Sequence, residues 1–476
     1  MTPVMEGKDD AMAILRTERL DVQGCRSGHG PATLGQRSIW TDIEFMMPDT
    51  SFYNSVVPVE IAPGVELETV FAGLRTLVER HGALRSFFFR GADGELVQQM
   101  MAEGEVVVEL CEAVSGRDSD LYSLVTDLET RIKEHCFDHV EQWPIRVGIG
   151  VLDGMPRVIL MSVSHIAADF PSLRILASEL HMIVHGGDVK PPPLQPLDFA
   201  QWERSPEGRR VQDRALRYWR RNLESMPPKL LTETDRTVEQ PRYPTVWLRS
   251  KAVALAATAL GTRCRVGSSA VLLAAIALLL GHAAGEKRVT MVLIAGNRTR
   301  STLRHYVGNL AQDVPADIDI TGKDFAAVAR SAWSSSMKAY RNAHCDRAET
   351  ARLRESVAME RGTDLELGYF FNDLRPTESQ NFKGDAPTFA LVRAAMSGTT
   401  TGVGTGAERD NLLVFLDVTD AGEEGIQLTL KADSRRLGSS EMARFLLRFE
   451  ALLVAAVEHG VDCGNEQLLK LAEEAA

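Results

Sequence analysis

Helix-like and strand-like segments alternate along the whole chain, and this alternation constrains the fold more than any other feature. Leu67 to His81 carries apolar residues at steps of three and four, the pattern of an amphipathic helix. Ile145 to Leu152 and Arg157 to Val163 are apolar runs joined by Asp153-Gly154, as expected for neighbouring strands. A second mixed half begins near Val246. We therefore predict a mixed α/β (α+β) protein with two lobes of roughly two hundred residues each.

Breaks in this pattern predict the limits of the parts. Residues 1–30 are polar and lead into Gly28-His29-Gly30-Pro31, so we expect an N-terminal extension there. The N-terminal lobe is expected over residues 31–196, a bridging helix and linker over 197–245, and the C-terminal lobe over 246–476. Within that lobe, Met396 to Arg409 is rich in Gly, Thr and Ser, which predicts a mobile loop.

Charge, cysteine content and hydropathy restrict the class of protein. With 65 acidic and 53 basic residues the formal net charge is −12, which disfavours nucleic-acid binding. The six cysteines form no C-x-x-C pair, so a reducing compartment is expected. The most apolar run, Ala270 to Leu280, is eleven residues long, which is too short for a membrane span and predicts a buried helix. Because the N-terminus also lacks the apolar core of a secretory signal, we expect a cytoplasmic protein that binds no membrane.

The most distinctive local segment is Ser164-His165-Ile166-Ala167-Ala168-Asp169-Phe170, between a predicted strand and a helix expected from Pro171. The ends of buried strands hold side chains rigidly at sites where ligands bind. The ordinary pKa of histidine, about 6.5, allows a neutral imidazole at position 165 to accept a proton. Asp169 either accepts a hydrogen bond from His165 or holds the loop through an ion pair. A hydrogen-bonded structural histidine is the alternative.

Several segments, taken in order, resemble the motifs of nonribosomal peptide synthetase condensation domains, within the chloramphenicol-acetyltransferase-like superfamily. Gln36 to Trp40 is similar to the opening Gln-Arg-x-x-Trp motif, and Arg80 to Phe87 to the Arg-His-x-x-Leu-Arg-x-x-Phe motif. Ser164 to Phe170 falls where the family carries His-His-x-x-x-Asp-Gly, and Asn297 to Arg300 resembles a later Arg motif. The other matching segments are Phe52-Tyr53-Asn54, Phe137-Asp138 with Pro144 and Arg146, Asp198 to Trp202 with Tyr218, Trp219 and Leu223, and Tyr369 to Asn372.

This resemblance implies two chloramphenicol-acetyltransferase-like lobes in a V shape, with an active-site tunnel between them. It implies that His165 is the general base or transition-state positioner for an amine or hydroxyl that attacks an acyl thioester. Asp169 would pair with Arg298 to hold the loop, and Arg85 would brace the same loop. Direct transfer can draw much of its acceleration from proximity, so Cys136 is not expected to act as a nucleophile.

Two positions depart from the family pattern. Ser164 stands where the family has its first histidine; a hydroxyl can still form hydrogen bonds, but it cannot carry a positive charge. Phe170 stands where the family has glycine, which allows close approach of the backbone to a ligand. The Phe170 ring either turns inward as the hydrophobic staple of the helix or narrows or seals the tunnel. The residues leave both alternatives open.

The resulting prediction is a free-standing condensation enzyme of secondary metabolism, such as antibiotic biosynthesis. It would transfer an acyl or aminoacyl group from a carrier protein to an amine or alcohol and form an amide or ester. An acyl or peptidyl carrier protein would supply the phosphopantetheine thioester in trans, and the chain itself is expected to bind no cofactor. The alternatives are a catalytically inactive recruitment domain, which the Ser164 and Phe170 changes suggest, and a CoA-dependent acyltransferase.

Three other groups of residues have weaker functional interpretations. His181 and His185 lie four residues apart on one predicted helix but lack a third ligand, so no metal site is expected. Trp202, Tyr218 and Trp219 are expected to pack between elements rather than to form a ligand cage. The helix expected over Phe199 to Leu223 carries a row of basic residues. This row is either a solvent-exposed face or a docking patch for an acidic carrier protein. Its basic residues are at positions 209, 210, 214, 217, 220 and 221.

Overall fold

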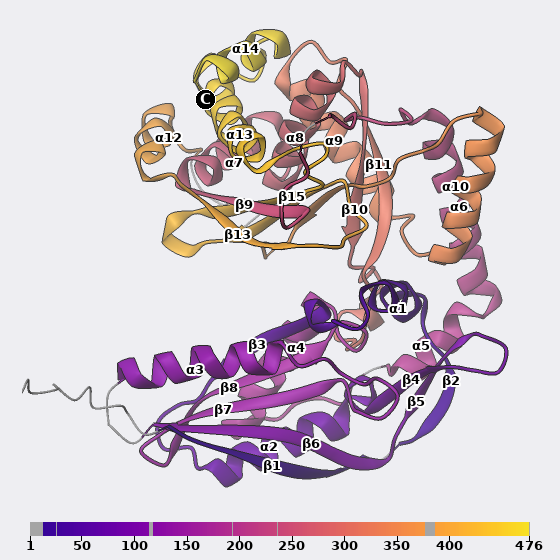
Figure 1. Ribbon diagram of the computed structural model, residues 1–476, viewed down its shortest axis with the longest axis vertical. Coiled ribbons are helices and arrows are strands. Elements are labelled where there is room, and N and C mark those ends of the chain that lie inside the picture. The colour runs from indigo at the N-terminus through magenta and orange to yellow at the C-terminus, as the bar shows by residue number, and fades with distance from the viewer. Residues whose placement is uncertain are drawn as a thin grey trace, which may run out of the picture. The chain divides into compact units, whose positions relative to one another are not determined.

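The computed structural model describes residues 13–24, 26–113, 118–192, 194–235, 237–376 and 386–475 (Figure 1). The chain divides into two compact units. Unit 1 comprises Met1–Arg210 and Gly296–Ala311, and unit 2 comprises Val211–Ala295 and Gln312–Ala476. Each unit combines β-sheet with packed helices, which confirms the predicted mixed fold class.

Unit 1 holds two sheets and most of the N-terminal helices. Its strands are β1 (Ala13–Gln23), β2 (Gly28–Pro31), β3 (Asn54–Glu60), β4 (Ser86–Arg90), β5 (Leu96–Met100), β6 (Glu103–Ala113), β7 (Ile145–Leu152) and β8 (Met155–Ser164). Its helices are α1 (Leu34–Met46), α2 (Leu67–Arg80), α3 (Asp118–Lys133), α4 (Phe170–Val184) and α5 (Pro196–Glu203), and α6 (Pro206–Ser225) begins in this unit. The larger sheet has the order β1-β6-β7-β8-β3, and the smaller one β2-β5-β4.

Alternating side chains of the larger sheet form two cores in unit 1. Successive residues of a strand point to opposite faces. Leu110 of β6 therefore packs in the core under α2 and α4, while its neighbour Cys111 packs with Leu128 and Ile132 of α3. The two helical layers cover opposite faces of this sheet (Figure 1). The end of β8 and the start of α4 are thus held within a packed layer.

The predicted N-terminal extension is wrong for residues 13–23. These residues form β1, which pairs with β6 along its whole length, from Ala13 opposite Ala113 to Gln23 opposite Glu103. Leu20 and Val22 of β1 are buried, whereas the side chains at positions 19, 21 and 23 are exposed to solvent. An edge strand with one wet face is polar on average, and for this reason the segment resembled an extension. Residues 1–12 and 25 of the same prediction lie outside the described residues.

Unit 2 is built on a seven-stranded sheet. Its strands are β9 (Tyr243–Ser250), β10 (Arg288–Ala295), β11 (Gln312–Asp319), β12 (Tyr369–Asp373), β13 (Thr400–Ala407), β14 (Val414–Asp420) and β15 (Ile426–Ala432), in the order β11-β10-β12-β14-β15-β9-β13. Its helices are α7 (Lys251–Cys264), α8 (Ser268–Ala284), α9 (Phe325–Tyr340), α10 (Arg347–Arg361), α12 (Phe389–Ala395), α13 (Ser439–His459) and α14 (Asn465–Ala475). Helix α8 is buried over Ala270–Leu280, which confirms the predicted buried helix.

In the part of the chain that the structure describes, no single helix is long and apolar enough to cross a membrane. Helices α7 and α8 meet that criterion only as a pair, and the pair is bent by 101°.

Three further predictions about the chain's organisation need correction. Residues 400–407, inside the expected mobile loop, form β13, which pairs with β9. A Cβ at Gly402 would lie 2.3 Å from the Trp247 indole, so glycine makes room for this ring. Because glycines replace the alternating side chains typical of a strand, the sequence did not indicate a strand here. The single bridging helix is two helices, α5 and α6, because Pro206 lacks the amide that would continue α5. Residues 296–311, expected in the C-terminal lobe, belong to unit 1.

Candidate functional site

The loop that carries His165 connects β8 to α4 and is fixed through its backbone. We call residues 165–169 the His165 loop. The amide of Ser164 donates to the carbonyl of Pro144 at 3.0 Å, and the amide of His165 donates to that of Tyr53 at 2.7 Å. Both acceptors lie in segments that match family motifs. These segments therefore determine where the strand ends.

Asp169 anchors the far end of the His165 loop. It is the N-cap of α4, and its Oδ1 accepts from the amide of Ser172 at 3.0 Å. Arg298 binds it with both terminal nitrogens, each at 2.6 Å, and the Leu310 amide donates to Oδ2 at 3.0 Å. The Asp169 side chain is only 1% exposed, so these donors compensate a buried charge. Of the two roles considered for Asp169, the structure shows the ion pair.

The same contacts fasten residues 296–311 to the start of α4. Arg298 also donates to Ser172 Oγ at 2.8 Å, and that hydroxyl donates to the carbonyl of Gly308 at 2.8 Å. The Gly308 amide donates back to Ser172 Oγ at 3.1 Å. Ser172 was missed by sequence reasoning, although its place three residues after an N-cap aspartate was a usable signal.

His165 is half-buried, and one of its two ring nitrogens is committed to the loop. Nδ1 lies 3.2 Å from the carbonyl oxygen of Ala168. Because a carbonyl oxygen only accepts hydrogen bonds, Nδ1 must carry the hydrogen in this contact. In the neutral ring, Nε2 is then the unprotonated nitrogen. No residue in the described ranges bonds to Nε2, so this atom is available to accept a proton.

Ser164 contacts a second histidine that sequence reasoning missed. Its Oγ lies 2.8 Å from Nε2 of His139, and both residues are buried. Trp40, from the opening motif, packs edge-on against the His139 ring at 5.8 Å between centroids. Burial lowers the pKa of His139 to about 4, against a smaller opposing effect of the Asp138 charge. The ring is therefore neutral near pH 7, and it is adjacent to the residue that precedes His165.

Phe170 does not turn inward as a hydrophobic staple, so this interpretation was wrong. The ring is 45% exposed, and Phe170 is the first residue of α4. A staple uses the residue before the N-cap and the fourth helical residue. Those positions are Ala168 and Leu173, and both are buried. The side chain at position 170 instead projects from the unit 1 core.

Arg85 does not brace the His165 loop in the way that was expected. It is 2% exposed and donates to the backbone carbonyls of Val78, Glu79, Arg26 and Met101. These carbonyls lie at the end of α2, before β2 and between β5 and β6. We therefore correct its role: Arg85 fastens the end of α2 to the neighbouring strands.

Two other residues of the same motif hold α4 instead. His81 Nε2 lies 2.8 Å, and Arg80 Nε 3.2 Å, from the carboxylate of Glu179 in α4. Burial raises the pKa of Glu179, but the hydrogen bonds and charges of His81 and Arg80 outweigh burial and hold this pKa below its usual value. This contact spans almost a hundred residues of sequence, and no local pattern pointed to Glu179.

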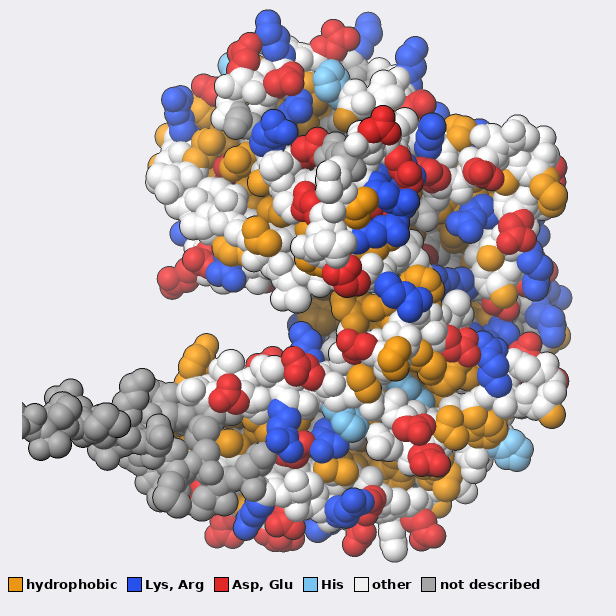
Figure 2. Space-filling model, viewed as in Figure 1, with side chains coloured by type: hydrophobic (Ala, Val, Ile, Leu, Met, Phe, Trp, Pro, Cys, Tyr) orange, Lys and Arg blue, Asp and Glu red, His pale blue; other side chains and the backbone are white. Residues whose placement is uncertain are grey.

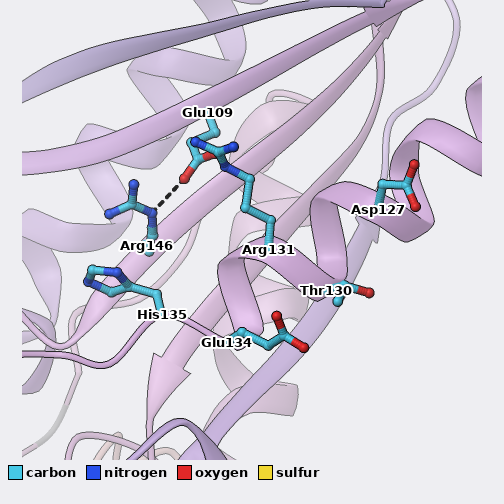
Figure 3. Close-up of a pocket in the computed structure, with 7 residues that line it drawn as sticks. All are labelled: Glu109, Asp127, Thr130, Arg131, Glu134, His135 and Arg146. Atoms are coloured by element: carbon cyan, nitrogen blue, oxygen red, sulfur yellow. Dashed lines mark hydrogen bonds and ion pairs between the residues drawn. The ribbon is translucent and has the colours of Figure 1, made fainter. Parts of the chain in front are cut away.

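A separate charged hollow of about 520 Å³ lies on unit 1, beside α3, β6 and β7 (Figure 3). Buried Glu109 accepts from Nε of Arg131 at 2.5 Å and from Nε of Arg146 at 2.7 Å. Figure 3 shows both guanidinium groups directed toward this carboxylate. Arg146, which belongs to a matched motif, therefore compensates the buried charge of Glu109 together with Arg131.

The remaining candidates have structural contacts. Both ring nitrogens of His185 form hydrogen bonds: Nδ1 donates to the His181 carbonyl at 2.7 Å, and Nε2 accepts from the Ala62 amide at 3.1 Å. No group of three or more metal-ligating side chains gathers among the residues that the structure describes. Trp202 stacks on Phe199 within unit 1, and Tyr218 and Trp219 are buried in unit 2, which confirms that these aromatic residues pack.

The basic side chains of α6 are mostly exposed. Arg220 pairs with Glu360 of α10 at 3.1 Å. The exposed members are Arg209, Arg210, Arg214, Arg217 and Arg221. Figure 2 shows acidic and basic side chains interspersed over the face in view.

Comparisons with known proteins identify the family and the fold of the chain. The Condensation domain family model matches residues 26–475, so the chain belongs to the condensation domain family. This family acts in nonribosomal peptide and polyketide-type biosynthesis and generally transfers acyl or aminoacyl groups from carrier-tethered substrates. A linear gramicidin synthase of Brevibacillus parabrevis is 28% identical over 217 residues, which are 44% of this chain and 4% of that protein. The chain thus spans a small part of this curated relative.

Two solved structures have the same fold. The SgcC5 protein of Streptomyces globisporus, solved with an aryl ethanediol and sucrose, aligns with a TM-score of 0.69 at 19% identity, over 91% of this chain and 100% of the other. The condensation domain of the Monacolin K polyketide synthase MokA aligns with a TM-score of 0.70 at 15% identity, over 92% and 99%. These alignments confirm the predicted chloramphenicol-acetyltransferase-like fold class.

Proposed function

We propose that this chain is an active acyltransferase of secondary metabolism. It transfers an acyl or aminoacyl group from the phosphopantetheine thioester of an acyl or peptidyl carrier protein to an amine or alcohol. The product is an amide or an ester. His165 is its catalytic residue, and the observation that carries the proposal is the state of its ring: Nδ1–H is held by the Ala168 carbonyl, and Nε2 is available.

The chemistry follows from this ring. The acceptor nitrogen or oxygen attacks the thioester carbonyl while Nε2 of His165 takes the acceptor's proton. The carbon–sulfur bond then breaks, and the leaving pantetheine thiolate receives that proton from the imidazolium. The two substrates supply every bond that is made or broken, so no covalent enzyme intermediate is required. A loop held by the Asp169–Arg298 pair keeps the imidazole in place, and proximity supplies much of the acceleration.

Three parts of the expected mechanism remain predictions. They are the V-shaped arrangement of the lobes, the tunnel between them and the docking of an acidic carrier protein on the arginines of α6.

Product formation with purified protein tests the proposal. Carrier proteins are loaded with a panel of acyl and aminoacyl groups and offered amine and alcohol acceptors, and products are identified by mass spectrometry. His165→Ala is expected to lower the rate by about 100- to 10,000-fold, the usual contribution of a general base. His29→Ala, an exposed histidine of β2, is the matched control and should keep the wild-type rate. Equal rates for wild type and His165→Ala would contradict the proposal.

The altered residues Ser164 and Phe170 favour one alternative, a recruitment domain without catalysis. In that case loaded carrier protein binds equally to wild type and His165→Ala, and neither forms product. Activity with free acyl-CoA that is undiminished when carrier protein is omitted would instead identify a CoA-dependent acyltransferase.

A further inference from the structure

A second imidazole reaches the position next to His165 from a distant segment. His139 lies between α3 and β7, twenty-five residues before Ser164. Its Nε2 is 2.8 Å from Ser164 Oγ, and His139 and Ser164 are 5% and 1% exposed. The His139 ring contacts the Trp40 ring edge-on at 5.8 Å and the tilted Phe137 ring at 6.1 Å between centroids. The contact between His139 and Ser164 is therefore buried, and two aromatic side chains pack against the His139 ring.

The place of this contact bears on the serine at position 164. The family motif that the loop matches carries histidine there, and serine is a much smaller side chain. In this protein the space beside the Ser164 hydroxyl holds the His139 ring. We propose that His139 supplies the imidazole missing from position 164 and acts, through Ser164, as a positioning residue for His165.

The positioning would act through the hydrogen bond between His139 and Ser164, the last residue of β8. Ser164 pairs with Asn54 in the sheet and donates its amide to Pro144, so its backbone is already fixed. The His139 bond fixes its side chain as well, and the next residue is His165. Removing the ring would leave a buried hydroxyl without this partner and a cavity beneath the loop. A displacement of about 1 Å in a catalytic group can lower a rate by about 100-fold.

A reciprocal exchange tests this inference, which rests on the proposed transfer reaction. His139→Ala removes the ring, and Ser164→His places a new imidazole where the His139 ring lies. We expect each single variant to lower kcat at least about tenfold with KM unchanged, because His139 is buried and a positioning residue acts on the rate rather than on substrate binding. The double variant conserves the ring at a new attachment point and is expected to recover at least half of the wild-type kcat.

Two controls separate positioning from stability. His29→Ala combined with Ser164→His should recover nothing, because His29 is exposed on β2 and leaves the space under Ser164 filled. Urea unfolding of wild type, His139→Ala, Ser164→His and the double variant of these two changes gives a second double-mutant cycle. This cycle measures stability and does not depend on acyl transfer.

Each result decides the inference. Recovery of kcat and coupled stabilities support it. Coupled stabilities without recovery of kcat overturn the positioning role, and additive effects in both measurements overturn the replacement itself. If wild type transfers nothing to any acceptor, the proposed function fails and the positioning role with it, while the unfolding cycle still decides whether His139 replaces the missing imidazole.

Discussion

A buried carboxylate in unit 1 and a partly buried one in unit 2 have opposite electrostatic surroundings. In unit 1, Asp169 is bound by both terminal nitrogens of Arg298 and by two backbone amides. In unit 2, Asp417 of β14 accepts from the side-chain amide of Asn372 at 2.9 Å, and the Lys431 ammonium donates to Asp410 at 3.2 Å. Burial raises the pKa of Asp417 to about 6, against the smaller effects of Asn372 and the Lys431 charge.

The difference shows how this fold uses charge. The Asp169–Arg298 pair holds a charged carboxylate that fixes the His165 loop to residues 296–311. The Asp417–Asn372 pair lies in regular strands, where the backbone ladder already fixes position, so the carboxylate there has no comparable anchoring task. Substitutions and pH changes at these carboxylates, at His139 and at Phe170 test this distinction.

The largest effect is expected from removing the cation of the anchor. Arg298→Met leaves the buried Asp169 carboxylate without a counter-charge and should lower the free energy of unfolding by about 3–5 kcal/mol, measured by urea denaturation at pH 7. Arg300→Met is the matched control, because the Arg300 side chain is 40% exposed where it pairs with Glu207. The control should cost less than about 1 kcal/mol. Equal losses in the two variants would show that Asp169 needs no counter-charge.

The second effect is the acid sensitivity of unit 1 at His139. Its pKa in the folded protein is about 4, below the unfolded value of about 6.5, so the unfolded chain binds more protons between these values. This contribution to stability is complete above pH 6.5 and is lost as pH falls toward 4. It amounts to about 2 kcal/mol between pH 7.5 and pH 5.

Urea denaturation at these two pH values measures that contribution. His139→Phe has no titrating ring at this position and should show a correspondingly smaller pH dependence. The same dependence in wild type and variant would contradict a buried neutral imidazole.

The third effect is expected at Asp417 and has the opposite sign. Its folded pKa is raised above the unfolded value, so the folded state binds the proton more tightly. The resulting stabilisation is present below about pH 4 and is lost as pH rises to about 6. Asp417→Asn keeps an oxygen that can accept from Asn372, and it should raise stability at pH 8 by about 1 kcal/mol, a value reduced for partial exposure of the side chain. Differential scanning calorimetry at pH 5 and pH 8 tests this, and a variant less stable than wild type at pH 8 would contradict it.

The smallest effect on stability is expected at Phe170. Because the ring is 45% exposed, Phe170→Ala should change the free energy of unfolding by less than about 0.5 kcal/mol. If the ring narrows the path to His165, both Phe170→Ala and Phe170→Gly should raise the transfer rate. Comparing the two variants separates the ring from the added backbone freedom of glycine. Lower rates in both would show that the ring assists binding.

The order of the motifs predicted much of the fold and part of the site. His165, Asp169 and Arg298 were identified because they occupy matched positions, and the structure joins Asp169 to Arg298. Helix α8 was predicted because a continuous apolar run of its length can only be buried. The prediction of individual strands failed where one face of the strand is exposed to solvent, as in β1, and where glycines replace the alternating side chains, as in β13.

The contacts that support the site were harder to predict. His139 and Glu179 act through residues far away in sequence, and neither position carries a local signal of its partner. Arg85 was assigned to the wrong loop because a motif gives the identity of a residue, not the carbonyls that it reaches. Such pairings depend on tertiary packing, which the linear pattern does not specify.

The single-turnover rate of acyl transfer from a loaded carrier protein, at saturating acceptor, tests the central claim most directly. The available Nε2 of His165 predicts that His165→Ala retains the wild-type unfolding curve and transfers the acyl group at least about 100 times more slowly. A His165→Ala protein that transfers at the wild-type rate would show that this imidazole takes no part in the reaction.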